Sequence, residues 1–334
     1  MMNTRTLGRT ELTVSEIGFG CGVTAGLMIN ATRQARREAV TRALDLGINY
    51  FDTAPVYGHS ASEANLGDVL NALGVQPIVA TKVALELPDL DDIAGAVVRS
   101  VEASLARLRL TRVQLVQLHN RVGPRRLARG EIGSGAVLTV DDVLGARGVL
   151  DALRSLRRRG LVDWFGCCAY GGEREAIERV IDSDAFDAML VNYSMLNTTA
   201  WETAPAASRL RDYGRVGARA AAAGVGTIAL RVLEGGALSG CDVRHPISGG
   251  GSSPDYADMV LRAARVEASL TGDSVSDAAI RFALCNPQVS TVLIGFSDVA
   301  QIEAAVKSAM RGPLAARSLS AIEQLRESDF GLSA

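Results

Sequence analysis

Short apolar runs alternate with longer amphipathic segments along almost the whole chain. The apolar runs are four to seven residues long, which is typical of buried strands, and most are closed by a glycine or a polar residue. The longer segments place apolar residues at helical spacing, as Val97, Val101 and Leu105 do. We predict strands over residues 15–20, 48–51, 77–82, 113–118, 162–168, 187–192, 225–231 and 289–294.

Each predicted strand is followed by at least one predicted helix. Thr32 suits the N-cap of the first, because its hydroxyl can accept a hydrogen bond from the first turn, and Gly47 suits its end. A hairpin around Gly8, over residues 6–14, precedes the first strand, and a polar, Gly- and Arg-rich excursion occupies 121–139. The predicted helices are 33–46, 62–73, 90–108, 141–159, 173–182, 205–223, 255–271, 274–285, 298–310 and one near 318–328.

Strict alternation of strand and helix predicts a parallel sheet, because parallel strands need crossover connections. Eight such units in about 300 residues fit a (β/α)8 TIM barrel, here with an N-terminal β-hairpin and an extra C-terminal helix. An open doubly wound sheet has the same periodicity and is the alternative fold. Because no interdomain linker is visible, we expect one domain over residues 1–334.

Composition excludes several classes of function. The chain has 334 residues, 48% of them hydrophobic, which allows a large core. A formal net charge of −2 argues against a nucleic-acid partner. No run of 18 apolar residues and no apolar leader segment are present, so we expect a cytoplasmic protein without a membrane partner. Five cysteines without a C-x-x-C motif, and three histidines, predict neither a disulfide framework nor a metal site. Nothing indicates the oligomeric state.

Lysine usage singles out one position. Of the 35 basic residues only Lys82 and Lys307 are lysine. Lys82 stands in the apolar run 78–83, where an unpaired ammonium would cost several kcal/mol to bury. A chain that otherwise uses arginine has therefore placed a lysine where its compact charge is needed. Asp52, at the end of the neighbouring predicted strand, is its natural partner.

Four polar residues lie at or just after the ends of three consecutive predicted strands, where the active site of a barrel forms. Asp52 and Tyr57 follow 48–51, Lys82 ends 77–82, and His119 follows 113–118. Alone, Asp52 is a turn cap, Tyr57 a packed aromatic and His119 a core histidine. Together with Lys82 they suit proton transfer, because an ammonium beside a phenol lowers its pKa from about 10. Tyr57 would then exchange a proton with a carbonyl or alcohol oxygen, while His119 relays or orients it. No side chain carries a hydride, so a redox reaction also requires a cofactor.

The segment GINYFDTAPVYG, residues 47–58, resembles the G-x-N-x-F-D-T-A-x-x-Y-G signature of the aldo-keto reductases. The resemblance extends over essentially the whole chain, including the opening hairpin and LEGGALSG at 233–240. It implies a (β/α)8 barrel that binds NADP(H), with a tyrosine acid/base supported by Asp, Lys and His. Those roles fall on Tyr57, Asp52, Lys82 and His119. Further matches are Ser62-Glu63, Leu66-Gly67, Thr81-Lys82 and Gln117-Leu118-His119.

The chain departs from that family where the cofactor would bind. Cys168-Ala169 and Leu190 replace the Ser-Asn pair and the Gln that usually hold the nicotinamide, and they are poor hydrogen bonders. Gln301 stands where a basic residue for the 2′-phosphate is common, and Asp298 would oppose a phosphate. Arg231 is the best remaining phosphate ligand. The chain therefore resembles a bacterial subgroup with altered nicotinamide-contact residues.

The resulting prediction is an NAD(P)(H)-dependent aldo-keto reductase that interconverts a small aldehyde or ketone and its alcohol. NADP(H) is the expected cofactor and NAD(H) the alternative. Two other functions stay open: a cofactor-independent lyase or isomerase that uses the same four residues, and a binding subunit without activity. The predicted cofactor-binding residues are Cys168, Leu190, Arg231, Leu233, Gly235, Gly295, Phe296, Ser297 and Gln301.

Overall fold

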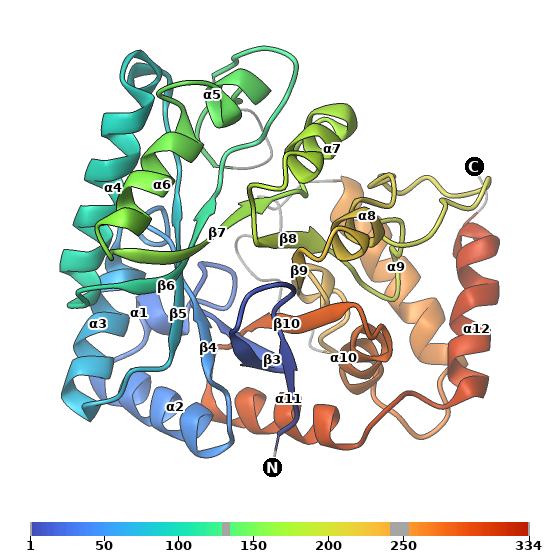
Figure 1. The fold of residues 1–334 in the computed structure, drawn as a ribbon. Coiled ribbons are helices and arrows are strands. Elements are labelled where there is room, and N and C mark those ends of the chain that lie inside the picture. The colour runs from blue at the N-terminus through green and yellow to red at the C-terminus, as the bar shows by residue number, and fades with distance from the viewer. Residues whose placement is uncertain (1, 129–133, 241–253, 333–334) are drawn as a thin grey trace.

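Eight parallel strands close into a barrel. The structure is a computed structural model that describes residues 2–128, 134–240 and 254–332 (Figure 1). The strands are hydrogen-bonded in the order β10-β3-β4-β5-β6-β7-β8-β9, and the two ends of that order, β10 and β9, also pair, Val292 with Ala229. This closure confirms the TIM barrel and excludes the open sheet. The strands are β3 (Ile17–Gly20), β4 (Tyr50–Asp52), β5 (Ile78–Val83), β6 (Val113–Leu118), β7 (Val162–Cys168), β8 (Ala188–Asn192), β9 (Gly226–Leu230) and β10 (Val289–Gly295).

A hairpin covers the N-terminal end of the barrel, as predicted. Its strands are β1 (Thr4–Thr6) and β2 (Thr13–Ser15), which pair antiparallel. Gly8 in the turn has φ +53°, and a Cβ there would lie 2.1 Å from the backbone nitrogen of Gly226, so the close approach requires glycine. Leu7 of the turn is fully buried in the core inside the barrel. The hairpin therefore occupies the N-terminal end of the barrel, and an active site is expected at the C-terminal ends of the strands.

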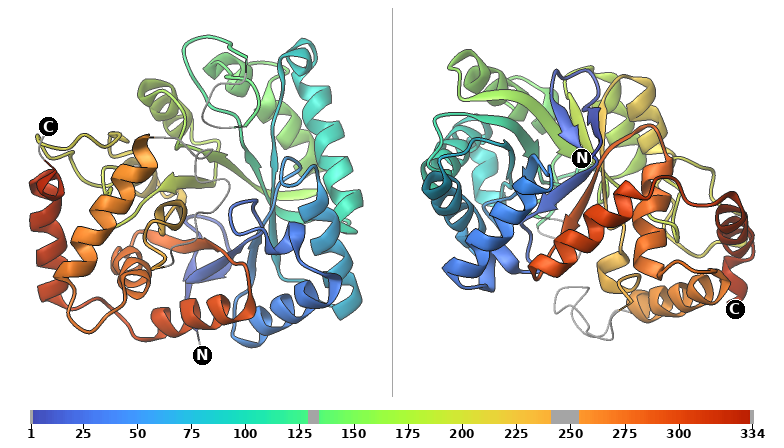
Figure 2. Two further views of the ribbon diagram at one scale, coloured as in Figure 1. Left: turned by 180° about the vertical axis from the view of Figure 1, so that it is seen from behind. Right: turned by 90° about the horizontal axis from the view of Figure 1, so that it is seen from below.

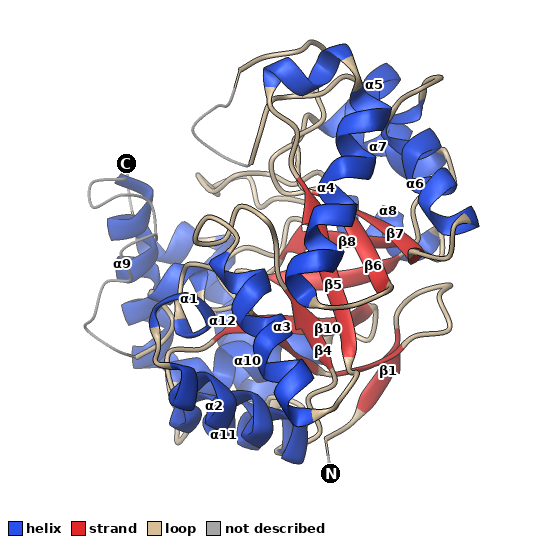
Figure 3. Cartoon of the chain, turned by 90° about the vertical axis from the view of Figure 1, so that its left-hand side faces the viewer, coloured by secondary structure: helices blue, strands red, loops and turns tan. Residues whose placement is uncertain are grey.

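Helices surround the strands on the outside (Figures 1 and 3). Two predicted helices are wrong in extent. The predicted helix 141–159 is two helices, broken at residues 145–148, where Arg147 has φ +59°. The predicted helix 205–223 exists only over its last turns, because backbone groups before it bond to side chains instead: Asn197 Nδ2 donates to Arg211 O at 2.9 Å, and Tyr213 N to Thr199 Oγ1 at 3.0 Å.

The other predicted helices are present, and none of their ends is shifted by more than three residues. Thr32 caps α2 as expected, accepting a hydrogen bond from Ala35 N. Near the C-terminus, α12 packs against α9 (Figure 2), and the buried Arg262 of α9 bonds to Asp329 at 3.0 Å. The α-helices are α1 (Leu27–Asn30), α2 (Arg33–Asp45), α3 (Ala61–Leu73), α4 (Ile93–Leu108), α5 (Val140–Leu144), α6 (Val149–Arg158), α7 (Arg174–Asp182), α8 (Val216–Ala222), α9 (Pro254–Ser269), α10 (Val275–Cys285), α11 (Val299–Met310) and α12 (Ala316–Glu327).

The core inside the barrel ends in a polar layer. Alternate residues of a strand point the same way, so each barrel strand sends every second side chain inward. Tyr50, Ala80 and Leu115 lie inside, and Asp52, Lys82 and Gln117 follow them two residues later. Within the described residues, no helix has the length and apolar character needed to cross a membrane. Nor do those residues include a group of three or more His, Cys, Asp or Glu that could hold a metal ion.

Candidate active site at the C-terminal end of the barrel

A buried ion pair lies at the centre of the polar layer. Lys82 of β5 and Asp52 of β4 are only 2% and 1% exposed, and Lys82 Nζ donates to Asp52 Oδ1. The ammonium also donates to Thr53 O at 2.9 Å. Burial alone would lower the pKa of Lys82, but the Asp52 carboxylate and Tyr57 raise it above its ordinary value. The predicted pairing is therefore present, and Lys82 carries a charge.

Gln117 holds the other oxygen of the same carboxylate. This residue of β6 lies in register with Lys82 and is fully buried. Its Nε2 donates to Asp52 Oδ2 at 2.7 Å, while its Oε1 finds no hydrogen-bond partner in the described part of the chain. Sequence reasoning used Gln117 only as part of the match to the family's histidine segment. A buried amide in the strand VQLVQL, two residues before His119, was the signal that could have singled it out.

We expect Gln117→Leu to lower the free energy of unfolding by about 1.5–3 kcal/mol, because it removes a hydrogen bond to a buried carboxylate. Activity should fall less than on loss of Tyr57. Urea unfolding followed by circular dichroism measures the stability. Gln34→Leu is the matched control, since Gln34 makes the same kind of bond, to Glu38 at 2.7 Å, on the exposed surface of α2. Equal losses in the two variants would contradict a positioning role for Gln117.

Tyr57 and His119 lie beside the pair. The Tyr57 ring, in the loop after β4, is 4.9 Å from Lys82 Nζ and meets the His119 ring edge-on, with the centroids 5.8 Å apart. Burial raises the pKa of Tyr57 to about 12, although the Lys82 ammonium lowers it in part. The expected lowering of the Tyr57 pKa by Lys82 is therefore present, but desolvation of the phenolate outweighs it, so the pKa of Tyr57 lies above 10.

His119 is a neutral imidazole. It lies directly after β6 and is 4% exposed, and burial together with the Lys82 charge lowers its pKa to about 3. Its Nε2 is 3.5 Å from Ser134 Oγ, whereas its buried Nδ1 has no partner among the residues described. An imidazole in this state gives or accepts a hydrogen bond but holds no charge at neutral pH. Tyr57 is therefore the better proton donor of the two.

The predicted nicotinamide contacts offer little polarity. Cys168 of β7 and Leu190 of β8 are paired in register, and both are buried in the core inside the barrel. Burial raises the pKa of the Cys168 thiol to about 12, so it stays neutral. The Phe296 ring packs edge-on against Phe19 with centroids 5.2 Å apart, which leaves only its backbone to meet a ligand. Cys168 and Leu190 thus lie together below the mouth of the barrel, whereas the Phe296 ring is packed in the core.

The predicted residues after β9 form an irregular turn. Arg231 is exposed and has φ +58°, which is uncommon for a residue with a side chain, and Gly235 has φ +64°. Leu233 is half-buried between them. Glu234 N donates to Arg231 O at 2.8 Å, and the Glu234 carboxylate accepts from Ser194 Oγ. Arg231 therefore presents a cation at the mouth.

The start of α11 is capped by its own side chains. Asp298 Oδ1 accepts from Gln301 N at 2.9 Å, and Gln301 Oε1 accepts from Ser297 N at 2.8 Å. Ser297 Oγ donates to Ala25 O at 3.0 Å, and Gly295 is exposed beside it. A carboxylate already fills the place that an anion prefers at a helix N-terminus. That Asp298 opposes a phosphate at this position stays a prediction.

Sequence comparison decides the family. The model of the Aldo/keto reductase family matches residues 16–327. The chain belongs to the aldo/keto reductase family. It is accordingly an oxidoreductase of carbonyl or alcohol substrates. Among characterised relatives of this aldo/keto reductase, L-galactose dehydrogenase of Arabidopsis thaliana is 29% identical over 309 residues, 90% of this chain and 85% of that protein. Pyridoxal 4-dehydrogenase of Microbacterium luteolum is 26% identical and covers 89% of this chain and 90% of that protein.

Solved structures confirm the fold of this aldo/keto reductase. Glycerol dehydrogenase AKR11B4 from Gluconobacter oxydans has a TM-score of 0.73 at 20% identity, covering 99% of this chain and 97% of that chain. Aldo-keto reductase AKR11C1 from Bacillus halodurans, in its holo form, has a TM-score of 0.72 at 24% identity, covering 97% and 96%. The hairpin and barrel of the present reductase are therefore an arrangement that solved proteins also adopt.

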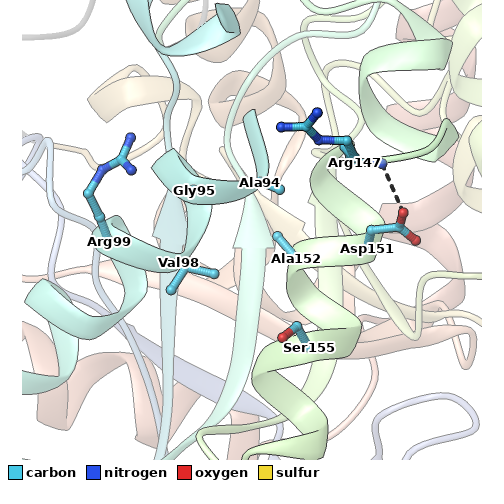
Figure 4. A pocket seen from close by; sticks show the side chains of 8 residues that line it. All are labelled: Ala94, Gly95, Val98, Arg99, Arg147, Asp151, Ala152 and Ser155. Carbon is cyan, nitrogen blue, oxygen red and sulfur yellow. Dashed lines mark hydrogen bonds between the residues drawn. The ribbon is translucent and has the colours of Figure 1, made fainter. Parts of the chain in front are cut away.

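A groove on the outer surface of this aldo/keto reductase lies away from the four candidate catalytic residues. The groove, of about 420 Å³, runs between α4 and α6 (Figure 4). Asp151 on its rim accepts a hydrogen bond from Arg147 N at 2.9 Å, and its floor is made of small and apolar side chains. None of the four candidate catalytic residues lines it. The groove is therefore separate from the candidate active site.

Proposed function

We propose that this reductase interconverts a small aldehyde or ketone and its alcohol, with a nicotinamide dinucleotide as the redox partner. The observation that carries the proposal is a phenol, Tyr57, beside the buried Lys82–Asp52 ion pair at the mouth of the barrel. Such a group exchanges protons with a substrate oxygen but supplies no electrons. When bound, the dinucleotide supplies the hydride that the four residues lack.

Each residue of the group has a distinct task in reduction. The Tyr57 O–H donates its proton to the carbonyl oxygen as negative charge develops there. The Lys82 ammonium stabilises the phenolate that remains, and Asp52, held by Gln117, keeps Lys82 charged and in place. His119, neutral and edge-on to Tyr57, offers an imidazole hydrogen bond to the same oxygen. In the oxidation of an alcohol the phenolate accepts the proton instead.

The residues at the mouth fit a nicotinamide at one end of the cofactor better than a 2′-phosphate at the other. The buried Nδ1 of His119, which has no partner in the described ranges, is a polar atom that a ligand can satisfy. Arg231 and the glycine turn after it suit the pyrophosphate or a further phosphate. The capped start of α11 suits no phosphate. The residues that would hold the dinucleotide are Cys168, Leu190, Arg231, Leu233, Gly235, Gly295, Phe296, Ser297 and Gln301, the phenylalanine through its backbone.

NADP(H) is the cofactor we propose, because the family resemblance implies it, with Arg231 as the phosphate ligand because it is the only cation among the predicted contacts. NAD(H) is the alternative, and the capped start of α11 favours it. Calorimetric titration with NADPH and NADH distinguishes the two. The relatives are named for L-galactose, pyridoxal and glycerol. These names agree with a small polar carbonyl compound, or its alcohol, as the substrate.

Cofactor consumption tests the proposed function. The purified protein is given NADPH or NADH with a panel of aldehydes and ketones, and NADP+ or NAD+ with polyols, and absorbance follows the nicotinamide. We expect turnover with at least one pair. Failure to bind either dinucleotide would contradict the proposal. Turnover of a substrate by protein stripped of nucleotide would instead favour a lyase or isomerase built on the same four residues. Tight cofactor binding without turnover on the panel would favour a binding subunit.

The pH dependence of the two directions should differ. Because burial raises the pKa of Tyr57 to about 12, the phenol is protonated throughout the neutral range. Single-turnover reduction should therefore be flat between about pH 6 and pH 9, whereas oxidation, which needs the phenolate, should rise about tenfold per pH unit. His119 does not interfere, since its pKa of about 3 lies below this range. An oxidation rate that levels off near pH 7 would contradict the raised pKa.

A further inference from the structure

An amide at the mouth of the barrel has an unused hydrogen-bonding atom. Asn192 is the last residue of β8, and its Nδ2 donates to the Tyr213 hydroxyl at 2.6 Å. Its Oδ1 is buried and has no partner within the described residues. Exchanging the two amide atoms would leave the nitrogen unpaired instead of the oxygen, so one polar atom is unused in either orientation. Buried polar atoms of this kind are normally satisfied, which points to a ligand.

The amide points to the same side as the cofactor contacts predicted from the sequence. Ala188 and Leu190 of β8 lie in the core inside the barrel, and Asn192 follows Leu190 by two residues, so its side chain has the same inward direction. Its register partner on β9, Leu230, also packs on that core. Asn192 therefore lies one layer above the Cys168–Leu190 pair, at the open end of the strands.

We propose that Asn192 binds the carboxamide of the nicotinamide ring and that Tyr213 positions the Asn192 amide. A primary carboxamide carries two N–H donors and one acceptor, so it can donate to the free Oδ1. Leucine offers no polar atom and the neutral thiol of Cys168 only a weak one, so the layer below cannot serve the carboxamide. This inference rests on the proposed dinucleotide and names a residue toward it that lies outside the sequence-predicted set.

The surroundings of Asn192 are consistent with the ring end of a dinucleotide. The charges of Glu234 and Arg231, on the turn after β9, act on the Tyr213 hydroxyl that Asn192 contacts. Arg231 and Tyr57 both act electrostatically on the Tyr170 hydroxyl. The Arg231 cation therefore lies on the same side of the barrel as the hydroxyl that holds Asn192. Tyr213 is itself held by its backbone N–H, which donates to Thr199 Oγ1 at 3.0 Å.

Calorimetric titration of the full-length Asn192→Leu variant tests the inference. The probes are NADPH, NADH and their nicotinamide-free counterparts, 2′-phospho-ADP-ribose and ADP-ribose. We expect the variant to bind the tighter-binding of NADPH and NADH with a Kd about tenfold higher, because one hydrogen bond is lost. The Kd of the matching nicotinamide-free compound should stay within about twofold. Tyr213→Phe, which frees the amide without removing it, should raise Kd about threefold. Asn65→Leu is the control, because its amide bonds to Met28 O at 2.8 Å outside the barrel.

The outcomes separate this inference from the proposed function. If the wild-type protein binds neither NADPH nor NADH, the proposed function and the role of Asn192 are both wrong. Wild type that binds a dinucleotide, with Asn192→Leu unchanged, overturns the role of Asn192 alone. Equal losses for the dinucleotide and its nicotinamide-free counterpart would show structural damage rather than a lost ring contact, and would also overturn it. Selective loss toward the intact dinucleotide supports it.

Discussion

Tyr57→Phe should lower kcat for carbonyl reduction by about 10²–10⁴-fold while leaving the Kd of the dinucleotide within about twofold. The change removes one oxygen atom and keeps the ring that packs against His119. Water can still supply a proton, but it is not held in place as the Tyr57 hydroxyl is, beside the Lys82 ammonium. Steady-state assays with the best substrate of the panel give kcat, and calorimetry gives Kd.

A second phenol serves as the control for that result. Tyr193 follows β8 and packs between Trp201 and Phe282 in the outer core, away from the inside of the barrel. Tyr193→Phe should therefore keep kcat within about twofold. If Tyr57→Phe retained wild-type turnover, another group would have to be the proton donor, and the proposed roles of all four residues would be wrong.

Lys82→Met should both inactivate the protein and lower its free energy of unfolding by about 3–5 kcal/mol. The methionine fills most of the space of the lysine stem, so the main cost comes from Asp52, whose buried carboxylate loses its partner. Because folding raises the pKa of Lys82, its contribution to stability is fully present below the ordinary lysine pKa and is lost only as the pH rises through the higher folded value. Urea unfolding near pH 7 measures it.

The double variant Asp52→Asn/Lys82→Met distinguishes charge from packing. It removes both charges, so we expect it to recover at least half of the lost stability while staying inactive. Lys82→Arg provides a complementary comparison, because a planar guanidinium is larger than the ammonium and cannot keep the same contacts with Asp52 Oδ1 and Thr53 O. A double variant less stable than Lys82→Met would contradict a buried carboxylate as the source of the loss.

Much of the candidate site follows from positions along the chain. Asp52, Lys82 and His119 each lie at or near the end of an apolar run, and the parallel order of strands brings such positions to one end of a barrel. The pairing of Lys82 with Asp52 was expected from the cost of burying an ammonium, and it is present. The irregular segment before α8 was not expected, because the side-chain contacts that hold it, such as that of Asn197 with Arg211, join residues far apart in any local pattern.

The sequence by itself predicted the alternating strands and helices, the N-terminal hairpin and the four polar residues at strand ends, because periodicity and strand ends are local properties. Only the tertiary structure decided that the sheet closes rather than staying open. It also decided that Gln117 holds Asp52, that desolvation outweighs Lys82 in its effect on the Tyr57 pKa, and that one Asn192 amide atom has no partner within the described residues. Those three depend on desolvation and on whether every hydrogen bond is made. Both are sums over neighbours that the chain assembles from several strands and loops, so no single segment contains them.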